Sequence, residues 1–180
     1  MTALFESGSS HFHCAWWDGE KISGYQTMTY PLDGLLTERI SCFLGNKIPE
    51  LIAACSVSSK WREKLFTALN ILCPGKLAVA RAASDITVIT SYKRPETYGI
   101  DRALAVYGAF DILGKSCVVI DIGTAVTVDA VDDEGRVIGG YIFPGPDMIS
   151  DMIAERTDLP VIHPEYNIAG IGVDTDSALK

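Results

Sequence analysis

The residues of this chain best suited to chemistry follow an apolar run in the stretch CVVIDIGTAVTVD, which spans 117–129. The β-branched residues before Asp121 are typical of a strand buried on both faces, and Gly123 permits a sharp reversal. Because 126–128 resumes as a strand, we expect Asp121 and Thr124 at a hairpin tip, where backbone amides can face an anion. The pattern indicates a phosphate site, with an ordinary β-hairpin as the alternative.

A similar pattern occurs 115 positions earlier, in the turn Glu6-Ser7-Gly8-Ser9-Ser10. Each copy has an acid, a glycine and a small residue, followed by a strand, an acidic turn and a second strand that ends in glycine. We interpret this as a duplicated unit, and the general similarity of β-hairpins is the alternative. Two such hairpins facing each other across a cleft would hold a phosphate chain from both sides. That plan resembles the actin, Hsp70 and sugar kinase superfamily.

Strands and helices must alternate along the chain to position these turns, and hydrophobic periodicity predicts such an order. The expected elements are strands within 3–17 on both sides of the first turn, a helix around 36–44, a strand over 48–57, a helix capped by Ser59 that ends before Pro74, a strand region over 77–90, a helix over 101–113 closed by Gly114, strands over 117–128 and 137–143 joined by a turn at 132–135, and a helix that ends near Thr157. The tail over 159–180 is expected to contain a turn over 170–175.

Composition and charge exclude several classes of function. The chain has 180 residues, 48% of them hydrophobic, which suits one large or two small folded domains. Its net charge is −8 and its 15 basic residues are scattered, so nucleic acid is not an expected partner. The five cysteines form no C-x-x-C pair, no basic stretch followed by an apolar core begins at Met1, and the longest uncharged apolar stretch is interrupted by Pro74. We therefore expect a reduced, cytoplasmic protein that is neither exported nor inserted into a membrane. The three histidines lack helical i,i+4 spacing and give a zinc site no support.

Three segments in a fixed order resemble motifs of the type III pantothenate kinases. YKRPETYGIDR at 92–102 is similar to the family's pantothenate segment, Tyr-x-x-Pro-x-x-x-Gly-x-Asp-Arg. DIGTAVT at 121–127 is similar to its second phosphate motif, and GGYIFPG at 139–145 to the segment that follows it. The resemblance implies an α/β protein with the duplicated ribonuclease H-like (actin-like ATPase) fold, in which mixed sheets are flanked by helices. Its halves would span 1–113, including the substrate segment, and 114–180, with the second half incomplete at its C-terminus.

The resemblance also implies an activity, the ATP-dependent phosphorylation of pantothenate to 4′-phosphopantothenate, which is the first step of coenzyme A synthesis. Transfer of the γ-phosphoryl group to an alcohol needs a carboxylate that accepts a proton and positive charge near the phosphates. Asp101 and Arg102 supply a negative and a positive charge at adjacent positions. By the resemblance, Asp101 would be the general base. The alternative is that Asp101 only caps a helix and that Arg102 forms a surface ion pair.

The remaining site residues are assigned by the same resemblance. The pantothenate pocket would be lined by Tyr92, Gly99, Ile100, Asp101 and Arg102, with Thr175 reaching it across a homodimer. ATP with Mg²⁺ would contact Glu6, Ser7, Gly8, Ser9, Ser10, His11, Phe12, His13 and Thr124. Asp121 would hold a monovalent cation, either potassium or ammonium. The alternatives are a turn aspartate that accepts backbone amides for Asp121 and a helix cap for Thr175.

Two features depart from the family pattern. The family's first phosphate motif has Asp and Asn where this chain has Glu6 and Ser9, so the carboxylate is one methylene longer and an amide is lost. Family members also continue well beyond the position that matches Lys180. A second hypothesis is therefore a binding or regulatory relative without catalysis. A third is a kinase of the same superfamily that acts on acetate or a sugar.

Overall fold

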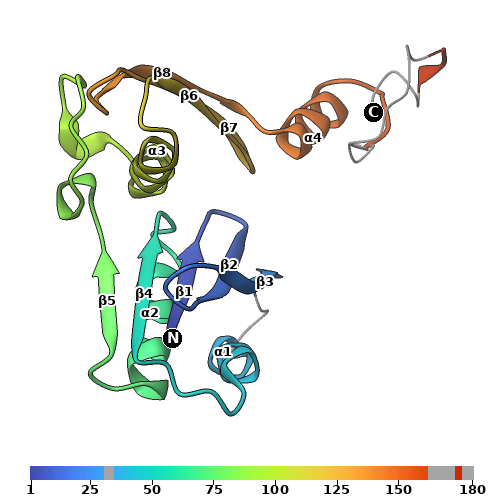
Figure 1. Ribbon diagram of the computed structural model, residues 1–180. Helices are drawn as coiled ribbons and strands as arrows, with labels where there is room; N and C mark the ends of the chain where they lie inside the picture. Colours follow the sequence, from blue (N-terminus) through green and yellow to red (C-terminus); the bar gives the residue numbers. More distant parts are fainter. Residues whose placement is uncertain (31–34, 162–172, 176–180) are drawn as a thin grey trace.

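The computed structural model describes residues 1–30, 35–161 and 173–175, and it contains two β-sheets with a helix between them (Figure 1). The first sheet has the strand order β3-β2-β1-β4-β5. Its strands are β1 (Thr2–Ser7), β2 (His11–Trp17), β3 (Ile22–Thr29), β4 (Leu51–Ser56) and β5 (Leu77–Ala80). Because β1 is antiparallel to β2 and parallel to β4, the chain forms a three-stranded meander and then crosses to the other side of β1.

Two helices cover one face of the first sheet. They are α1 (Leu36–Leu44) and α2 (Arg62–Leu72). Successive side chains of a strand point to opposite faces, so alternate residues of β1 point toward these helices. Phe5 on this face is 2% exposed and packs in one core with Ile40 of α1, Ile52 of β4 and Leu69 of α2. Glu6, which follows Phe5, therefore points to the opposite face of the sheet.

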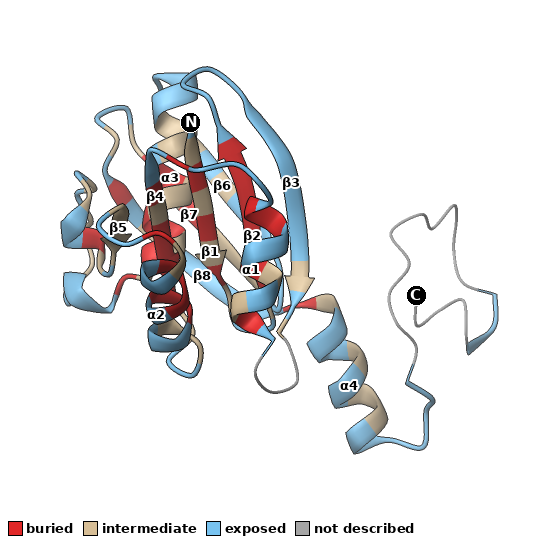
Figure 2. Ribbon diagram, turned by 90° about the horizontal axis from the view of Figure 1, so that it is seen from below, coloured by how far each residue is buried: buried red, intermediate tan, exposed pale blue. Residues whose placement is uncertain are grey.

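The second sheet consists of three antiparallel strands in the order β6-β7-β8. They are β6 (Cys117–Ile122), β7 (Ala125–Val131) and β8 (Val137–Pro144). The helical segments around them are η1 (Ala83–Asp85), η2 (Pro95–Thr97), α3 (Ile100–Leu113) and α4 (Pro146–Arg156). Helix α3 contacts β6 and β7 as well as β4 of the first sheet, whereas α4 projects away from both sheets (Figure 1, Figure 2). Val131 and Val137 of the second sheet pack on Ala103 and Val106 of α3.

The two sheets repeat one another. β6 begins 115 positions after β1, β8 begins 115 positions after β3, and both sets of three strands form an antiparallel meander. In the first sheet β1 lies between β2 and β4, whereas β6 pairs only with β7 among the described residues. Val118 and Ile120, the counterparts of the buried Ala3 and Phe5, are 61% and 60% exposed. The predicted α/β fold with sheets flanked by helices is confirmed; the first sheet is mixed and the second is antiparallel. The division between 113 and 114 stays a prediction.

The helical boundaries follow the sequence closely. Helix α3 begins one residue before the predicted start and is closed by Gly114 in the left-handed conformation, as expected. The N-cap position of α2 is Trp61, without a side-chain cap hydrogen bond, so the prediction that Ser59 caps this helix is wrong. In the turn before the helix, Ser58 Oγ accepts a hydrogen bond from Trp61 N at 3.2 Å. Within the described residues no helix has the length and apolar character needed to cross a membrane. Most of the turn predicted over 170–175 lies outside the described residues.

One predicted strand is shorter than expected. The strand region over 77–90 ends at Ala80, and the chain turns into η1. The cause is Asp85, whose Oδ2 accepts hydrogen bonds from the backbone N of Arg81 at 2.6 Å and of Ala82 at 3.1 Å. Aspartate side chains that bond nearby amides favour turns over strands, and hydrophobic periodicity does not report this competition.

Replacing Gly114 with alanine tests the closure of α3. Gly114 has a φ of 61°, which costs an alanine about 1 kcal/mol. We therefore expect Gly114→Ala to lower the free energy of unfolding by about that amount, measured by urea denaturation. Gly108→Ala in the same helix is the matched control: a Cβ there also has open space but ordinary helical backbone, so it should stabilise by up to about 1 kcal/mol. Equal effects of the two substitutions would contradict this account of the cap.

Candidate functional site

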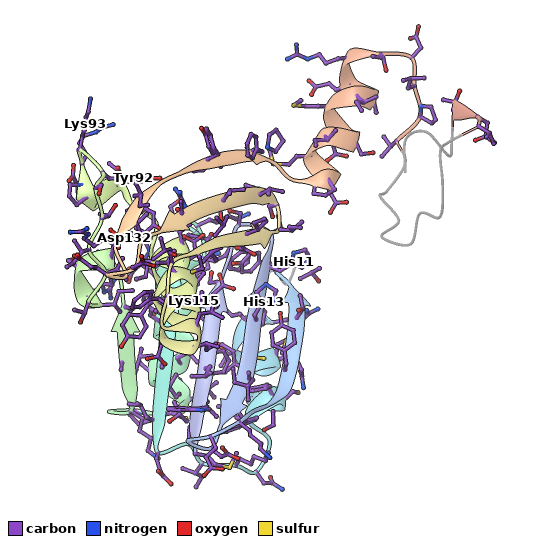
Figure 3. All side chains as sticks on the ribbon, turned by 45° about the horizontal axis from the view of Figure 1, so that its top comes forward. His11, His13, Tyr92, Lys93, Lys115 and Asp132 are labelled. Atoms are coloured by element: carbon purple, nitrogen blue, oxygen red, sulfur yellow. The ribbon has the colours of Figure 1, made fainter. Side chains whose placement is uncertain are left out.

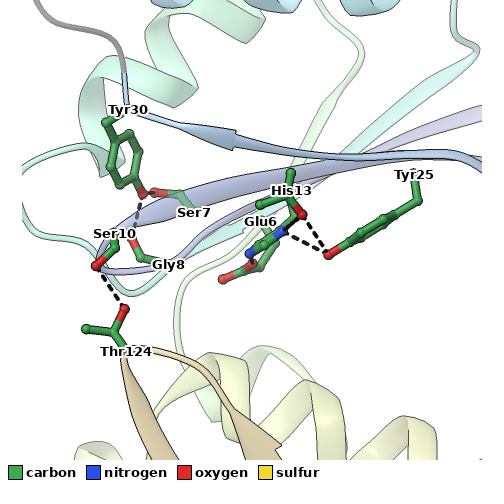
Figure 4. A network of polar contacts seen from close by, with 9 residues as sticks. Glu6, Ser7, Gly8, Ser10, His13, Tyr25, Tyr30 and Thr124 are labelled. Atoms are coloured by element: carbon green, nitrogen blue, oxygen red, sulfur yellow. Dashed lines mark hydrogen bonds and ion pairs between the residues drawn. The ribbon is translucent and has the colours of Figure 1, made fainter. Parts of the chain in front are cut away.

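The two acid and glycine turns meet between the sheets (Figure 4). Ser10 Oγ in the β1–β2 turn lies 2.9 Å from Thr124 Oγ1 in the β6–β7 turn, and the two hydroxyl groups form a hydrogen bond. Each turn is closed by the backbone amide of its own glycine, Gly8 or Gly123, which donates to a carbonyl two or three residues further on. The structure thus brings hydroxyl groups from both halves of the chain to one point.

Three carboxylates from different elements share the space beside these turns. Glu6 extends from β1, Asp101 from the first turn of α3 and Asp121 from β6. Burial, and then repulsion from Asp101 and Asp121, raises the pKa of Glu6 from 4.5 to about 7. Both aspartates therefore repel the Glu6 carboxylate, and a cation placed among the three groups would offset this repulsion.

These three carboxylates suit a cation that takes most of its ligands from water and from a bound substrate. In the part of the chain that the structure describes, no group of three or more His, Cys, Asp or Glu side chains is close enough to hold a metal ion alone. Mg²⁺ usually binds through one or two carboxylates, water and substrate phosphates, which fits carboxylates beside two phosphate-type turns. Asp121 is exposed and therefore open to a ligand.

Histidines on β2 complete the surroundings of Glu6. His11 and His13 project from the same strand, with ring centres 6.5 Å apart (Figure 3). His13 Nε2 is 3.7 Å from Glu6 Oε2, and His13 Nδ1 forms a hydrogen bond of 2.9 Å with Tyr25 OH. Burial and the neighbouring His11 lower the pKa of His13, although Asp121 opposes this shift. Glu6 and His13 both line a largely apolar cavity of about 590 Å³ on the face of the first sheet away from α1 and α2.

Two residues of the predicted ATP segment lie in the core instead. Phe12 is 0% exposed and belongs to the core of the first sheet, and Ser7 is also 0% exposed, with its Oγ 2.7 Å from Tyr30 OH. Ser7 and Phe12 pair across β1 and β2, so both side chains point to the helix-covered face. Their side chains are therefore not available to ATP, and only their backbone groups could make the predicted contact, which stays a prediction. Ser9 and Ser10 are exposed at the tip of the turn.

Asp101 lies inside the first turn of α3 and does not cap the helix. The N-cap position is Gly99, and Asp101 Oδ1 accepts a hydrogen bond from Arg102 N at 2.8 Å. A Cβ at Gly99 would lie 2.5 Å from this oxygen, so the carboxylate occupies the space that glycine leaves. The alternative of a helix cap is therefore wrong for Asp101. Ile100, also predicted to line the pocket, is 3% exposed, so its side chain is not available to a ligand.

Arg102 is buried and holds a carboxylate with two nitrogens. Its Nη2 lies 2.6 Å from Oδ1 of Asp129 on β7, and its Nε lies 3.0 Å from Oδ2. Nη2 also donates to Tyr92 OH at 2.8 Å, and Tyr98 OH donates to Asp129 Oδ1 at 3.0 Å. Burial alone would lower the pKa of Arg102, but the hydrogen bonds with Asp129 and Tyr92 leave it above its ordinary value. The alternative of a surface ion pair is therefore wrong.

Besides Tyr98, the sequence analysis missed Asp129 in this cluster. It is the last residue of the stretch CVVIDIGTAVTVD and is 1% exposed. The available signal was an acid in a strand whose other residues are apolar except Thr127, because acids are almost never fully buried without a partner. Sequence spacing alone did not identify Arg102, which is 27 positions away, as that partner.

Two glycines of the segment 139–145 are required by close contacts within the site. Gly140 lies opposite Asp129 in the sheet, and a Cβ there would be 2.8 Å from both Arg102 Nη2 and Asp129 Oδ1. A Cβ at Gly145 would be 2.5 Å from Thr124 O, which accepts the Gly145 amide at 2.9 Å. This segment therefore supports both the ion pair and the second turn without supplying a side chain.

Thr175 is not brought to this site within one chain. It belongs to the short described stretch 173–175, it is exposed, and this stretch lies beyond α4, away from both sheets (Figure 1). Its predicted role depends on a second copy of the chain, so it stays a prediction.

The raised pKa of Glu6 predicts how stability changes with pH. Its stabilising effect is fully present below pH 4.5 and is lost as the pH rises through about 7, because the folded protein then holds a buried charge that the unfolded chain exposes to water. Glu6→Gln removes this charge, so we expect the variant to be more stable than the unaltered protein at pH 8, by roughly 1 kcal/mol given the partial exposure of Glu6. Urea denaturation at pH 5 and pH 8 measures the effect, with the exposed Glu20→Gln as control. A gain that is the same at both pH values would contradict it.

Comparison with known proteins places the chain in a family. A sequence model of the type III pantothenate kinases matches residues 3–180. The type III pantothenate kinase of Halorhodospira halophila is 34% identical over 134 residues, which cover 69% of this chain and 52% of that protein. The enzyme of the same name from Dichelobacter nodosus is 29% identical over 180 residues, which cover 84% of this chain and 73% of that protein. The chain thus spans about half the length of the first of these relatives.

Solved structures show the same fold at low sequence identity. A Campylobacter jejuni protein described as a Baf family transcriptional activator has a TM-score of 0.56 at 22% identity, over 98% of this chain and 71% of its own. The activator of 2-hydroxyisocaproyl-CoA dehydratase from Clostridium difficile, solved with bound ADPNP, has a TM-score of 0.50 at 12% identity, over 99% of this chain and 62% of its own. These similarities concern the fold alone. With the family model matching almost from end to end, the chain belongs to the type III pantothenate kinase family.

Proposed function

We propose that this chain phosphorylates pantothenate with ATP, giving 4′-phosphopantothenate for coenzyme A synthesis. The observation that carries the proposal is the convergence of Asp101 with the two hydroxyl-bearing turns, since a kinase must bring a proton acceptor and its phosphate-binding groups together. Family membership supports the choice of pantothenate as acceptor.

Asp101 would act as the general base. Its carboxylate would accept the proton of the pantothenate hydroxyl while the hydroxyl oxygen bonds to the γ-phosphorus and the bond to the β-phosphate oxygen breaks, releasing ADP. Gly99 leaves room for the carboxylate, and the position in the first turn of α3 favours a negative charge. Arg102 beside it would attract the acceptor's own carboxylate.

The phosphate side of the site would use both turns. Ser10 and Thr124 would release each other and hydrogen bond to phosphate oxygens, together with backbone amides of their turns. Mg²⁺ would neutralise charge on the phosphates, and Glu6 would hold it, directly or through water. A potassium or ammonium ion at Asp121, a homodimer that brings Thr175 to the pocket, and a cytoplasmic location are further parts of this proposal.

Replacing the proposed base tests the mechanism. We expect Asp101→Asn to lower kcat at least ~10²-fold, because the amide cannot accept the proton, while the Kd for ATP changes little. Turnover is measured with ATP, pantothenate, magnesium and potassium, and ATP binding by calorimetry. Asp111→Asn, near the exposed end of the same helix, is the matched control and should keep full activity. Unchanged turnover of Asp101→Asn would show that another group accepts the proton.

A second candidate function is a weakened or non-catalytic relative that binds pantothenate and regulates another protein. The observation that favours it is Glu6, whose longer side chain stands where the family has aspartate. Glu6→Asp distinguishes the two functions. If Glu6 weakens an active kinase, the shorter side chain should raise turnover, by on the order of tenfold, since small misplacements of a catalytic group are costly. Pantothenate binding without turnover, in both the unaltered chain and Glu6→Asp, would support the second candidate.

A further inference from the structure

We propose that Asp129 is a positioning residue of the acceptor site, which holds the Arg102 guanidinium so that its remaining nitrogen faces the carboxylate of the acceptor. The inference rests on the proposed function, because it assigns Asp129 a role in binding the acceptor. Asp129 lies outside the segment 92–102, on β7 of the second sheet.

The guanidinium of Arg102 is fixed from several directions. Asp129 uses both carboxylate oxygens, and the two side chains are only 7% and 2% exposed. The ring of Tyr98 lies 4.8 Å and that of Tyr92 5.7 Å from Arg102 Cζ, measured to the ring centres. A planar guanidinium held by a two-point ion pair and stacked on aromatic rings has little rotational freedom. Its orientation is therefore set by Asp129 and the two tyrosines.

The hydrogen bonds leave one nitrogen of Arg102 for a ligand. Nε and Nη2 are used by Asp129 and Tyr92, and no hydrogen bond joins Nη1 to any described residue. Nη1 also keeps some exposure to solvent. Among the described residues, the fully buried side-chain polar atom that lacks a hydrogen-bond partner is Arg62 Nε, and Arg102 Nη1 is not such an atom. An arginine carries five N–H donors, so the two on Nη1 can bind an oxyanion.

The position of Asp129 also relates the two substrates. Asp129 and the turn residue Thr124 belong to the same hairpin, with Thr124 directly before β7 and Asp129 within it. Five residues of extended strand span about 17 Å. Strand β7 therefore carries Asp129, which orients the acceptor-binding arginine, and follows directly on Thr124 of the proposed phosphate turn. Gly140 on β8 leaves room for the ion pair.

Asp129→Asn tests this role with two independent measurements on the full chain. The amide is nearly the same size as the carboxylate but lacks its charge, and only one oxygen can still accept from Arg102. We expect the Kd for pantothenate, from calorimetry, to rise at least tenfold while the Kd for ATP changes less than twofold. We also expect the Arg102 Nε–H signal in ¹⁵N NMR, assigned with Arg102→Lys, to exchange with solvent at least tenfold faster.

Two further variants keep the test decisive. Asp132→Asn makes the same chemical change three residues further on, in the turn between β7 and β8, at an exposed pair with Arg136. It should alter neither the Arg102 exchange rate nor the Kd for pantothenate. Tyr98→Phe removes one hydrogen bond from Asp129 without changing charge, so it should weaken pantothenate binding two- to fivefold even if Asp129→Asn does not fold.

The outcomes separate the inference from the proposed function. If the unaltered chain does not bind pantothenate, the proposed function fails and the acceptor role of Asp129 fails with it. If the unaltered chain binds pantothenate and both Asp129→Asn and Tyr98→Phe bind it equally well, only the inference is overturned. Equal losses of ATP and pantothenate binding would also overturn it, because they indicate a general structural effect.

Discussion

The buried ion pair between Arg102 and Asp129 is the interaction on which the arrangement of the site depends. Removing two charges from water is costly, so each partner needs the other and both need further hydrogen bonds. Tyr92 and Tyr98 supply these bonds, and Gly140 leaves the space that the pair occupies. The pair joins α3 to the second sheet at the residue next to Asp101. A shift of α3 along the second sheet would break the ion pair. The position of the Asp101 carboxylate therefore depends on where α3 is held against β7.

The rest of the site is built from groups that repel one another when no ligand is present. Glu6, Asp101 and Asp121 come from three elements, and after burial the repulsion from the two aspartates contributes to the raised pKa of Glu6. Such an arrangement lowers the stability of the empty protein and gains stability when cations bind, since ligands that bind only the folded state stabilise it. The Ser10–Thr124 hydrogen bond, by contrast, satisfies the two turns in the absence of ligand.

The sequence predicted the parts of the fold that local patterns determine. Helix α3 and its closure at Gly114 follow from apolar composition and a terminal glycine, and the repeat over 115 positions gave the duplicated sheets. The end of β5 was missed because it depends on the Asp85 carboxylate competing for backbone amides. In the site, the turns were found by their glycines and acids. Asp129 was missed because its partner is distant in sequence and adjacent only in the folded chain.

The core of the second sheet has a consequence for the order in which the protein forms. The first sheet packs with α1 and α2 in a core of its own, whereas the second sheet packs largely on residues that precede it in the chain, between Ala83 and Val106. During synthesis the first sheet can therefore fold as soon as β5 has left the ribosome. Helix α3 must wait for β6 and β7 before its apolar face is covered. The residues of the proposed acceptor site on α3 and β7 thus reach their final places after the first sheet.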